Sequence, residues 1–124
     1  MKTLMLVDDD EQVRSSMGEL LRQLGFSVLL MQDGASALTA LQGTAKVDCF
    51  ILDYQMPGMD GLELLAAIKG KAPDIPVIMI TGYGDIESYL KAVGLSASEN
   101  LDKPVRLREL QRVVRAAMNA SSEM

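Results

Sequence analysis

Polar residues that can bind a cation and a phosphoryl group follow the ends of several short apolar runs. The clearest runs occupy residues 4–7, 50–52 and 77–80. The polar residues after these runs, with one lysine after a weaker run, are Asp8, Asp9, Asp10, Asp53, Thr81 and Lys103. Because ligands bind at the carboxyl edge of a parallel α/β sheet, we expect carboxylates, a hydroxyl and an amine to share one cleft.

The residue types in this set indicate phosphoryl-transfer chemistry. Neighbouring carboxylates repel one another, so a cleft that holds three of them requires a cation, and hard oxygen ligands favour Mg²⁺. Asp53 can act as a nucleophile and form an acyl phosphate. Lys103 can neutralise charge on the transferring group, and Thr81 can donate a hydrogen bond to a phosphoryl oxygen.

Strand and helix patterns alternate along the chain and position these residues. The sequence predicts strands over 4–7, 26–31, 49–52, 77–80 and 98–101, the last with a poor pattern. Apolar residues at helical spacing predict helices over 13–24, 37–41, 64–68, 86–93 and 107–117. Five such units predict a flavodoxin-like (βα)5 fold of three layers, with a parallel sheet in the order 2-1-3-4-5. In this order the first and third strands are neighbours, which brings Asp8 and Asp9 to Asp53.

The composition of the 124 residues excludes several other classes of protein. An apolar content of 48% and a charged content of 23% are typical of one globular domain. A net charge of −5 argues against a nucleic-acid binder, and no apolar run reaches the roughly 20 residues that span a bilayer. Without histidine there is no His-based triad or His-ligated zinc site. Cys49 is the only cysteine, so no internal disulfide is possible, which favours a reducing cytoplasmic setting. Its thiol is expected to be buried and inert.

Four motifs carry a resemblance to a known family: residues 6–10 (LVDDD), 52–61 (LDYQMPGMDG), 80–82 (ITG) and 102–104 (DKP). In their order and spacing, the chain resembles the receiver domain of two-component response regulators over essentially its whole length. The stretch 73–82 (PDIPVIMITG) is similar to receivers of the nitrogen-regulation type. The resemblance implies a phosphorylation-controlled signalling switch, with a receiver domain over 1–119 and a polar tail over 120–124.

The resemblance implies a role for each acid of the site. Asp53 would accept a phosphoryl group from a phosphohistidine on a sensor histidine kinase or a histidine phosphotransfer protein. The domain would catalyse only its own phosphorylation and dephosphorylation. Asp9, Asp53 and the backbone carbonyl of Gln55 would bind Mg²⁺, and Asp8 would act largely through a bound water.

The resemblance also implies residues that sense the phosphoryl group. Thr81 and Lys103 would contact it, and their movement would report phosphorylation to a distant face. Pro104 would follow a cis peptide bond that holds Lys103 over the site, as X-Pro bonds permit. Gly82 is the small residue that usually follows the threonine.

The chain departs from the family at the usual switch residue. Asn100 stands where receivers usually have Phe or Tyr, three residues before the lysine. We therefore hypothesise that Tyr83 reorients beside Thr81 instead. Gln55 and Tyr83 also occupy the positions that tune self-hydrolysis in this family, and the bulk of Tyr83 predicts slow autodephosphorylation.

Two other functions stand as alternatives. A haloacid-dehalogenase-like phosphatase also forms an aspartyl phosphate, but it needs a second aspartate as general acid where this chain has Gln55. A pseudo-receiver would keep the fold as an interaction module without phosphorylation. Asn100 and the weak fifth strand favour the pseudo-receiver slightly, whereas the intact acids, Thr81 and Lys103 argue against it.

The sequence leaves the partners beyond the kinase open. The signal would pass to a downstream protein target or to an output domain, in a stand-alone regulator or a longer one. No direct contact with nucleic acid or with a membrane is expected. A homodimer through the last two helices is compatible with the family. Four arginines near the end are expected to form a solvated helix face: Arg106, Arg108, Arg112 and Arg115.

Overall fold

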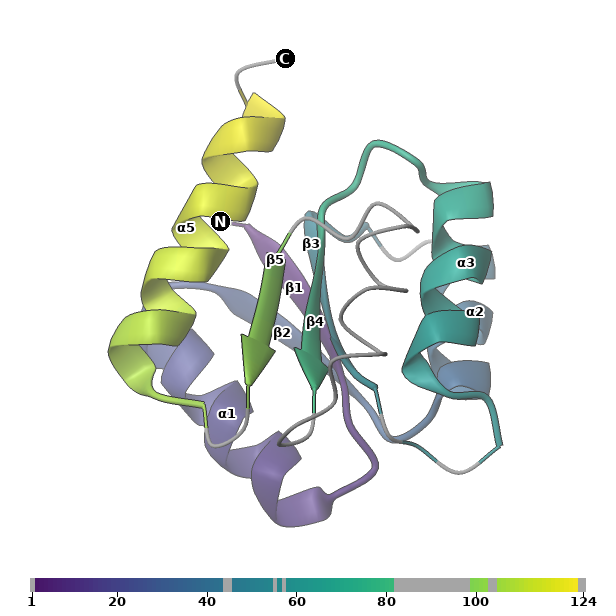
Figure 1. Ribbon diagram of the computed structural model, residues 1–124, viewed down its shortest axis with the longest axis horizontal. Helices are drawn as coiled ribbons and strands as arrows, with labels where there is room; N and C mark the ends of the chain where they lie inside the picture. The colour runs from purple at the N-terminus through teal and green to yellow at the C-terminus, as the bar shows by residue number, and fades with distance from the viewer. Residues whose placement is uncertain are drawn as a thin grey trace.

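The computed structural model describes residues 2–43, 46–54, 56, 58–81, 99–102 and 105–122. Its elements in chain order are β1 (Thr3–Val7), α1 (Glu11–Gln23), β2 (Ser27–Met31), α2 (Gly34–Gln42), β3 (Cys49–Asp53), α3 (Gly61–Lys71), β4 (Val77–Thr81), β5 (Glu99–Asp102) and α5 (Leu107–Ser122). Figure 1 shows a central sheet with α1 and α5 on one face and α2 and α3 on the other. The three predicted layers are therefore present. The helix predicted over 86–93 lies outside the described residues.

The five strands are parallel and lie in the order β2-β1-β3-β4-β5. This result confirms the predicted flavodoxin-like order, in which the direction of strand addition reverses at β1. Each strand lies within one residue of its predicted bounds. The strand with the poorest pattern, β5, occupies 99–102 rather than 98–101.

Alternate side chains of the central strands enter two separate hydrophobic cores. In β1, Leu4 and Leu6 pack in the core formed with α1 and α5, whereas Met5 and Val7 pack in the core formed with α2 and α3. All four side chains are fully buried. Because β1 is covered on both faces, its sequence is a continuous apolar run rather than an alternation of apolar and polar residues. Cys49 is also fully buried, as predicted.

Aspartates cap three of the described helices at their N-termini. The carboxylate of Asp10 accepts hydrogen bonds from the backbone N–H groups of residues 12 and 13, at 2.9 and 3.1 Å. Asp33 caps α2 through the N–H group of Ser36 at 2.7 Å, and this bonding lowers the pKa of Asp33. Asp60 caps α3 through the N–H group of residue 63 at 2.9 Å. These carboxylates satisfy donors that a helix leaves without partners and so fix the residue at which each helix begins, just after the carboxyl end of a strand.

The last helix is longer than its apolar pattern predicts. Its buried stripe consists of Leu110, Val113, Val114, Ala117 and Met118. Leu107, at the first position of α5, is 43% exposed because it precedes the part of the helix that covers the sheet. The helix then continues through Ser122, into the segment assigned to a polar tail.

None of the helices within the described residues combines the length and the apolar character that a membrane-spanning segment requires.

Candidate functional site

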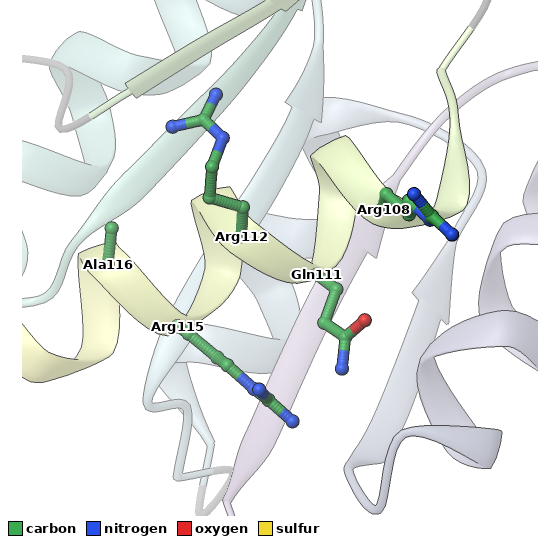
Figure 2. A pocket seen from close by; sticks show the side chains of 5 residues that line it. All are labelled: Arg108, Gln111, Arg112, Arg115 and Ala116. Carbon is green, nitrogen blue, oxygen red and sulfur yellow. The ribbon is translucent and has the colours of Figure 1, made fainter.

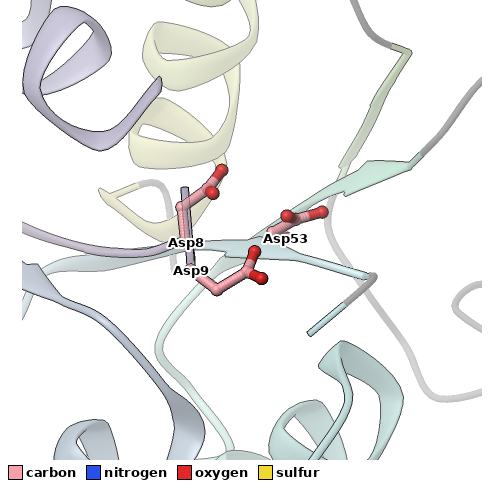
Figure 3. Close-up of side chains that lie close together, drawn as sticks. All are labelled: Asp8, Asp9 and Asp53. Atoms are coloured by element: carbon pink, nitrogen blue, oxygen red, sulfur yellow. The ribbon is translucent and has the colours of Figure 1, made fainter. Parts of the chain in front are cut away.

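Three aspartates meet where β1 and β3 end. Val7 of β1 pairs with Leu52 of β3, and the next residues of the two strands are Asp8 and Asp53. Asp9 follows in the turn that leads to α1. One carboxylate oxygen of each aspartate lies within 4.8 Å of the other two, and Figure 3 shows the three side chains at the strand ends. The structure thus brings together the three acids that the sequence pattern predicts.

The three carboxylates differ in their exposure to solvent. Asp8 is 0% exposed and Asp53 is 2% exposed, whereas Asp9 is exposed. Burial and mutual repulsion both disfavour the charged form of a carboxylate, and a bound divalent cation would offset both effects. A donor set made only of carboxylate oxygens suits a hard cation such as Mg²⁺ better than zinc. The arrangement therefore fits a magnesium site that is open to solvent at Asp9.

Hydrogen bonds fix the turn from β1 into α1. The N–H group of Asp8 donates to the carbonyl of Met31 at 3.1 Å, and the N–H group of Asp10 donates to Oδ1 of Asp8 at 2.9 Å. From α1, Nη1 of Arg14 donates to the carbonyl of Asp8 at 2.7 Å. Sequence reasoning missed Arg14, whose only signal is its position one helical turn after the N-cap residue.

Gly61 allows the start of α3 to lie against the end of β3. Its N–H group donates to the carbonyl of Tyr54 at 2.9 Å. A Cβ atom at this position would lie 2.5 Å from the carbonyl oxygen of Asp53 and 2.7 Å from Cα of Tyr54. Both neighbours are backbone atoms, so only glycine allows α3 to support the strand that carries Asp53.

A hollow on α5 is lined by arginines, so its charge is positive, opposite to that of the acid cluster. It has a volume of about 600 Å³, and Figure 2 shows the side chains that line it: Arg108, Gln111, Arg112, Arg115 and Ala116. The three arginines are exposed, in agreement with a solvated helix face, whereas Arg106 is also exposed but precedes α5. No carboxylate lines this hollow, so it offers no cation site. The acid cluster at the sheet edge is the candidate functional site.

Comparison with known proteins assigns the family. The family model of the response regulator receiver domain matches residues 4–115. The chain belongs to the response-regulator receiver family. It is thus a receiver domain of the kind that acts as a phosphorylation-controlled signalling switch in two-component systems.

Known proteins match this receiver in both sequence and fold. It is 35% identical over 115 residues to the transcriptional regulatory protein FixJ of Bradyrhizobium diazoefficiens. This match covers 93% of the receiver and 56% of FixJ. The crystal structure of NtrX from Brucella abortus matches with a TM-score of 0.93 and 32% identity, over 99% of the receiver and 28% of NtrX. A response regulator receiver domain from Clostridium thermocellum matches with a TM-score of 0.93 and 27% identity, over 99% of the receiver and 98% of that chain. The receiver therefore spans only about half of FixJ and less than a third of NtrX.

Members of this family share general kinds of partner and a ligand. Response regulator receivers interact with histidine kinases and with output domains. They typically bind Mg²⁺ at an acidic pocket, and Asp8, Asp9 and Asp53 form an acidic cluster of a kind that can hold a metal ion.

Several residues that were predicted to form the receiver site lie outside the described residues: Gln55, Gly82, Tyr83, Lys103 and Pro104. Thr81 is the last residue of β4. The residue before it, Ile80, pairs with Asp53 of β3. Asn100 lies in β5 and pairs with Met79 of β4. The backbone thus carries Thr81 to the same edge of the sheet as Asp53, and the roles of all these residues stay predictions.

Proposed function

We propose that this receiver accepts a phosphoryl group on the carboxylate of Asp53. The observation that supports the proposal is the convergence of three carboxylates within 4.8 Å, with Asp53 only 2% exposed at the end of β3. A carboxylate oxygen of Asp53 attacks the phosphorus atom of a phosphohistidine. The new O–P bond forms as the P–N bond breaks, and the imidazole nitrogen keeps the electron pair and takes up a proton.

The acids around Asp53 bind the cation that this transfer requires. Asp9 and Asp53 bind Mg²⁺ directly, the backbone carbonyl of Gln55 adds a ligand, and Asp8 acts largely through a bound water. When bound, Mg²⁺ neutralises charge on the phosphoryl oxygens. The burial of Asp8 and Asp53 excludes bulk water, which strengthens electrostatic interactions within the site.

Residues beyond the acid cluster detect the phosphoryl group and control its lifetime. Thr81 donates a hydrogen bond to a phosphoryl oxygen, and Lys103, held by the peptide bond before Pro104, neutralises its charge. The small residue Gly82 leaves room for Thr81 to move toward the phosphoryl group. Because Asn100 replaces the usual aromatic residue, Tyr83 reorients beside Thr81, and together with Gln55 it limits access of the attacking water.

We also propose the wider role of this receiver in the cell. The receiver unit comprises residues 1–119 and acts in the cytoplasm, with a sensor histidine kinase or histidine phosphotransfer protein as phosphoryl donor. It catalyses its own phosphorylation and dephosphorylation and no other reaction. Phosphorylation changes its contact with a downstream protein or an output domain, or with a second copy through the last two helices, and it does not itself bind nucleic acid or a membrane.

The direct test is the intact mass of the protein after incubation with acetyl phosphate and Mg²⁺. We expect a single phosphoryl gain that is abolished by EDTA or by Asp53→Asn. Asp10→Asn is the matched control, because Asp10 lies in the same acidic run but caps α1 and does not belong to the cluster. A gain that persists in Asp53→Asn would place the acceptor elsewhere.

The alternatives give different results in the same experiment. A folded protein that gains no phosphoryl group and binds no beryllofluoride is a pseudo-receiver. Repeated turnover of a generic phosphate ester would instead indicate a phosphatase. Either result would contradict the proposed function.

A further inference from the structure

Two arginines of α1 each donate to a backbone carbonyl six residues away, at opposite ends of the helix. At the start of α1, Nη1 of Arg14 lies 2.7 Å from the carbonyl oxygen of Asp8. At the end of α1, Nη2 of Arg22 lies 3.3 Å from the carbonyl oxygen of Val28 in β2. The two bonds are of the same kind, but only the first one holds a residue of the acid cluster, and it is the shorter one.

The hydrogen bond of Arg14 is one of four that hold the turn on both sides of Asp9, and we call these four bonds the bracket. On the strand side, the N–H group of Asp8 donates to the carbonyl of Met31 at 3.1 Å. On the helix side, the N–H group of Asp10 donates to the Asp8 carboxylate at 2.9 Å, and the carbonyl of Asp10 accepts from the N–H group of Arg14 at 2.9 Å. The Arg14 side chain then returns to the Asp8 carbonyl. Both ends of the turn are fixed, with Asp9 exposed between them.

Arg14 has two effects on the cluster, and they have opposite signs. Carboxylates within 4.8 Å of one another repel, which pushes the turn away from β3, and the bracket resists this movement. A site that is already arranged binds its ion more tightly. The positive charge of Arg14, in contrast, repels an incoming cation. The direction of the change in Mg²⁺ affinity when Arg14 is replaced therefore shows which effect dominates.

We propose that Arg14 is a positioning residue for the cation site, because its bond to the Asp8 carbonyl holds the carboxylates of Asp8 and Asp9 in the arrangement that binds Mg²⁺. The inference rests on the cation site of the proposed function and does not depend on phosphoryl transfer. Loss of the Arg14 side chain weakens Mg²⁺ binding, even though it removes a charge that repels the ion.

Calorimetric titration of the unphosphorylated chain with Mg²⁺ tests this proposal. Arg14→Met keeps much of the apolar stem but removes the donor and the charge, and we expect it to bind Mg²⁺ about tenfold more weakly than wild type. Arg14→Lys keeps the charge and one donor, and we expect an intermediate affinity. Arg22→Met removes the matching bond at the other end of α1, and we expect it to bind Mg²⁺ as wild type does.

Thermal unfolding with and without Mg²⁺ separates positioning from a general loss of stability. Both methionine variants lower the Tm of the cation-free protein. Only Arg14→Met also reduces the rise in Tm that Mg²⁺ produces, because stabilisation by a ligand follows its affinity. Unchanged or tighter Mg²⁺ binding in Arg14→Met would overturn the proposal. It would also be overturned if Arg22→Met reduced the Mg²⁺-induced rise in Tm as much as Arg14→Met does. If Arg14→Met does not fold, wild-type affinity in Arg14→Lys overturns it.

These results distinguish failure of the inference from failure of the proposed function. A wild type that binds no Mg²⁺ overturns both. A wild type that binds Mg²⁺ but gains no phosphoryl group overturns only the proposed function. A phosphorylated wild type with unchanged Mg²⁺ affinity in Arg14→Met overturns only the inference.

Discussion

Both edges of the sheet bond polar side chains to nearby backbone, but only the carboxyl edge also gathers like charges. At the amino edge, where the strands begin, polar groups bond to nearby backbone. Asp48 accepts from the N–H group of Thr3 at 2.7 Å, and Lys69 donates from Nζ to the carbonyl of Ile75 at 3.2 Å. At the carboxyl edge, aspartates also bond to backbone as helix caps, but the three acids of the cluster are in addition gathered within 4.8 Å. Gathering like charges works against folding, so this arrangement has value only for a ligand, whereas the amino edge serves stability.

The largest expected effect comes from the two ends of α3, which reach opposite edges of the sheet. Gly61→Ala is expected to lower the free energy of unfolding by about 3 kcal/mol, because the new Cβ meets the backbone of Asp53 at 2.5 Å. Gly70→Ala, near the amino edge, is expected to raise it by roughly 0.5–1 kcal/mol, because nothing lies within 4 Å and alanine favours the helix. Urea unfolding measures both changes. Equal effects at the two glycines would show that the carboxyl edge is not the more tightly constrained one.

A second prediction concerns Cys49 at the start of β3. Burial raises the pKa of this thiol from 9.0 to about 12. Because the pKa of the folded state is the higher one, the contribution of the thiol to stability is complete below pH 9 and is lost as the pH rises from 9 to 12. The free energy of unfolding should fall by about 1.4 kcal/mol for each pH unit in this window, and thus by about 2 kcal/mol at pH 10.5.

Cys49→Ala supplies the control for this pH dependence. The variant is less stable at pH 8 because it leaves a small cavity, but it lacks the loss of stability that comes from the thiol. Subtracting its urea-unfolding profile from that of wild type removes the contributions of lysine and tyrosine residues, which titrate in the same range. A thiol that reacts rapidly with an alkylating reagent in the folded protein at pH 8 would contradict the assignment of a buried, inert cysteine.

The pattern of apolar residues predicted the fold well for a physical reason. Strands buried on both faces must be continuous apolar runs, so their positions and the residues that follow them are visible in the sequence. A parallel sheet then brings the acids at the ends of β1 and β3 together without further information. The meeting of Asp8, Asp9 and Asp53 was predictable for this reason.

Other features depend on contacts that leave no pattern in the sequence. The bond from Arg14 to the Asp8 carbonyl joins a side chain to the backbone, and an arginine on a polar helix face looks the same with or without such a bond. The polar residues up to Ser122 continue α5 without an apolar stripe, so periodicity ended the predicted helix at Ala117. Leu107 matched the spacing of the stripe but lies at the helix start, beyond the core.

The smallest expected effect concerns Lys69, a lysine in the last turn of α3 near the amino edge. Its Nζ donates to the carbonyls of Ile75 at 3.2 Å and Pro73 at 3.5 Å, and burial lowers its pKa. Lys69→Met keeps the apolar stem and loses these bonds, so we expect the free energy of unfolding to fall by about 1 kcal/mol, measured in urea. Lys71→Met, at an exposed position on the same helix, should change it by less than about 0.5 kcal/mol.

The same lysine variant decides whether the two edges are separate in function. Lys69 donates a hydrogen bond to the loop between α3 and β4 and does not belong to the acid cluster. The rise in Tm that Mg²⁺ produces should therefore be the same in Lys69→Met as in wild type, although both melting curves begin from a lower Tm. A reduced rise would mean that the amino edge helps to arrange the carboxylates across the length of the sheet. In that case the division between an edge for stability and an edge for chemistry would be wrong.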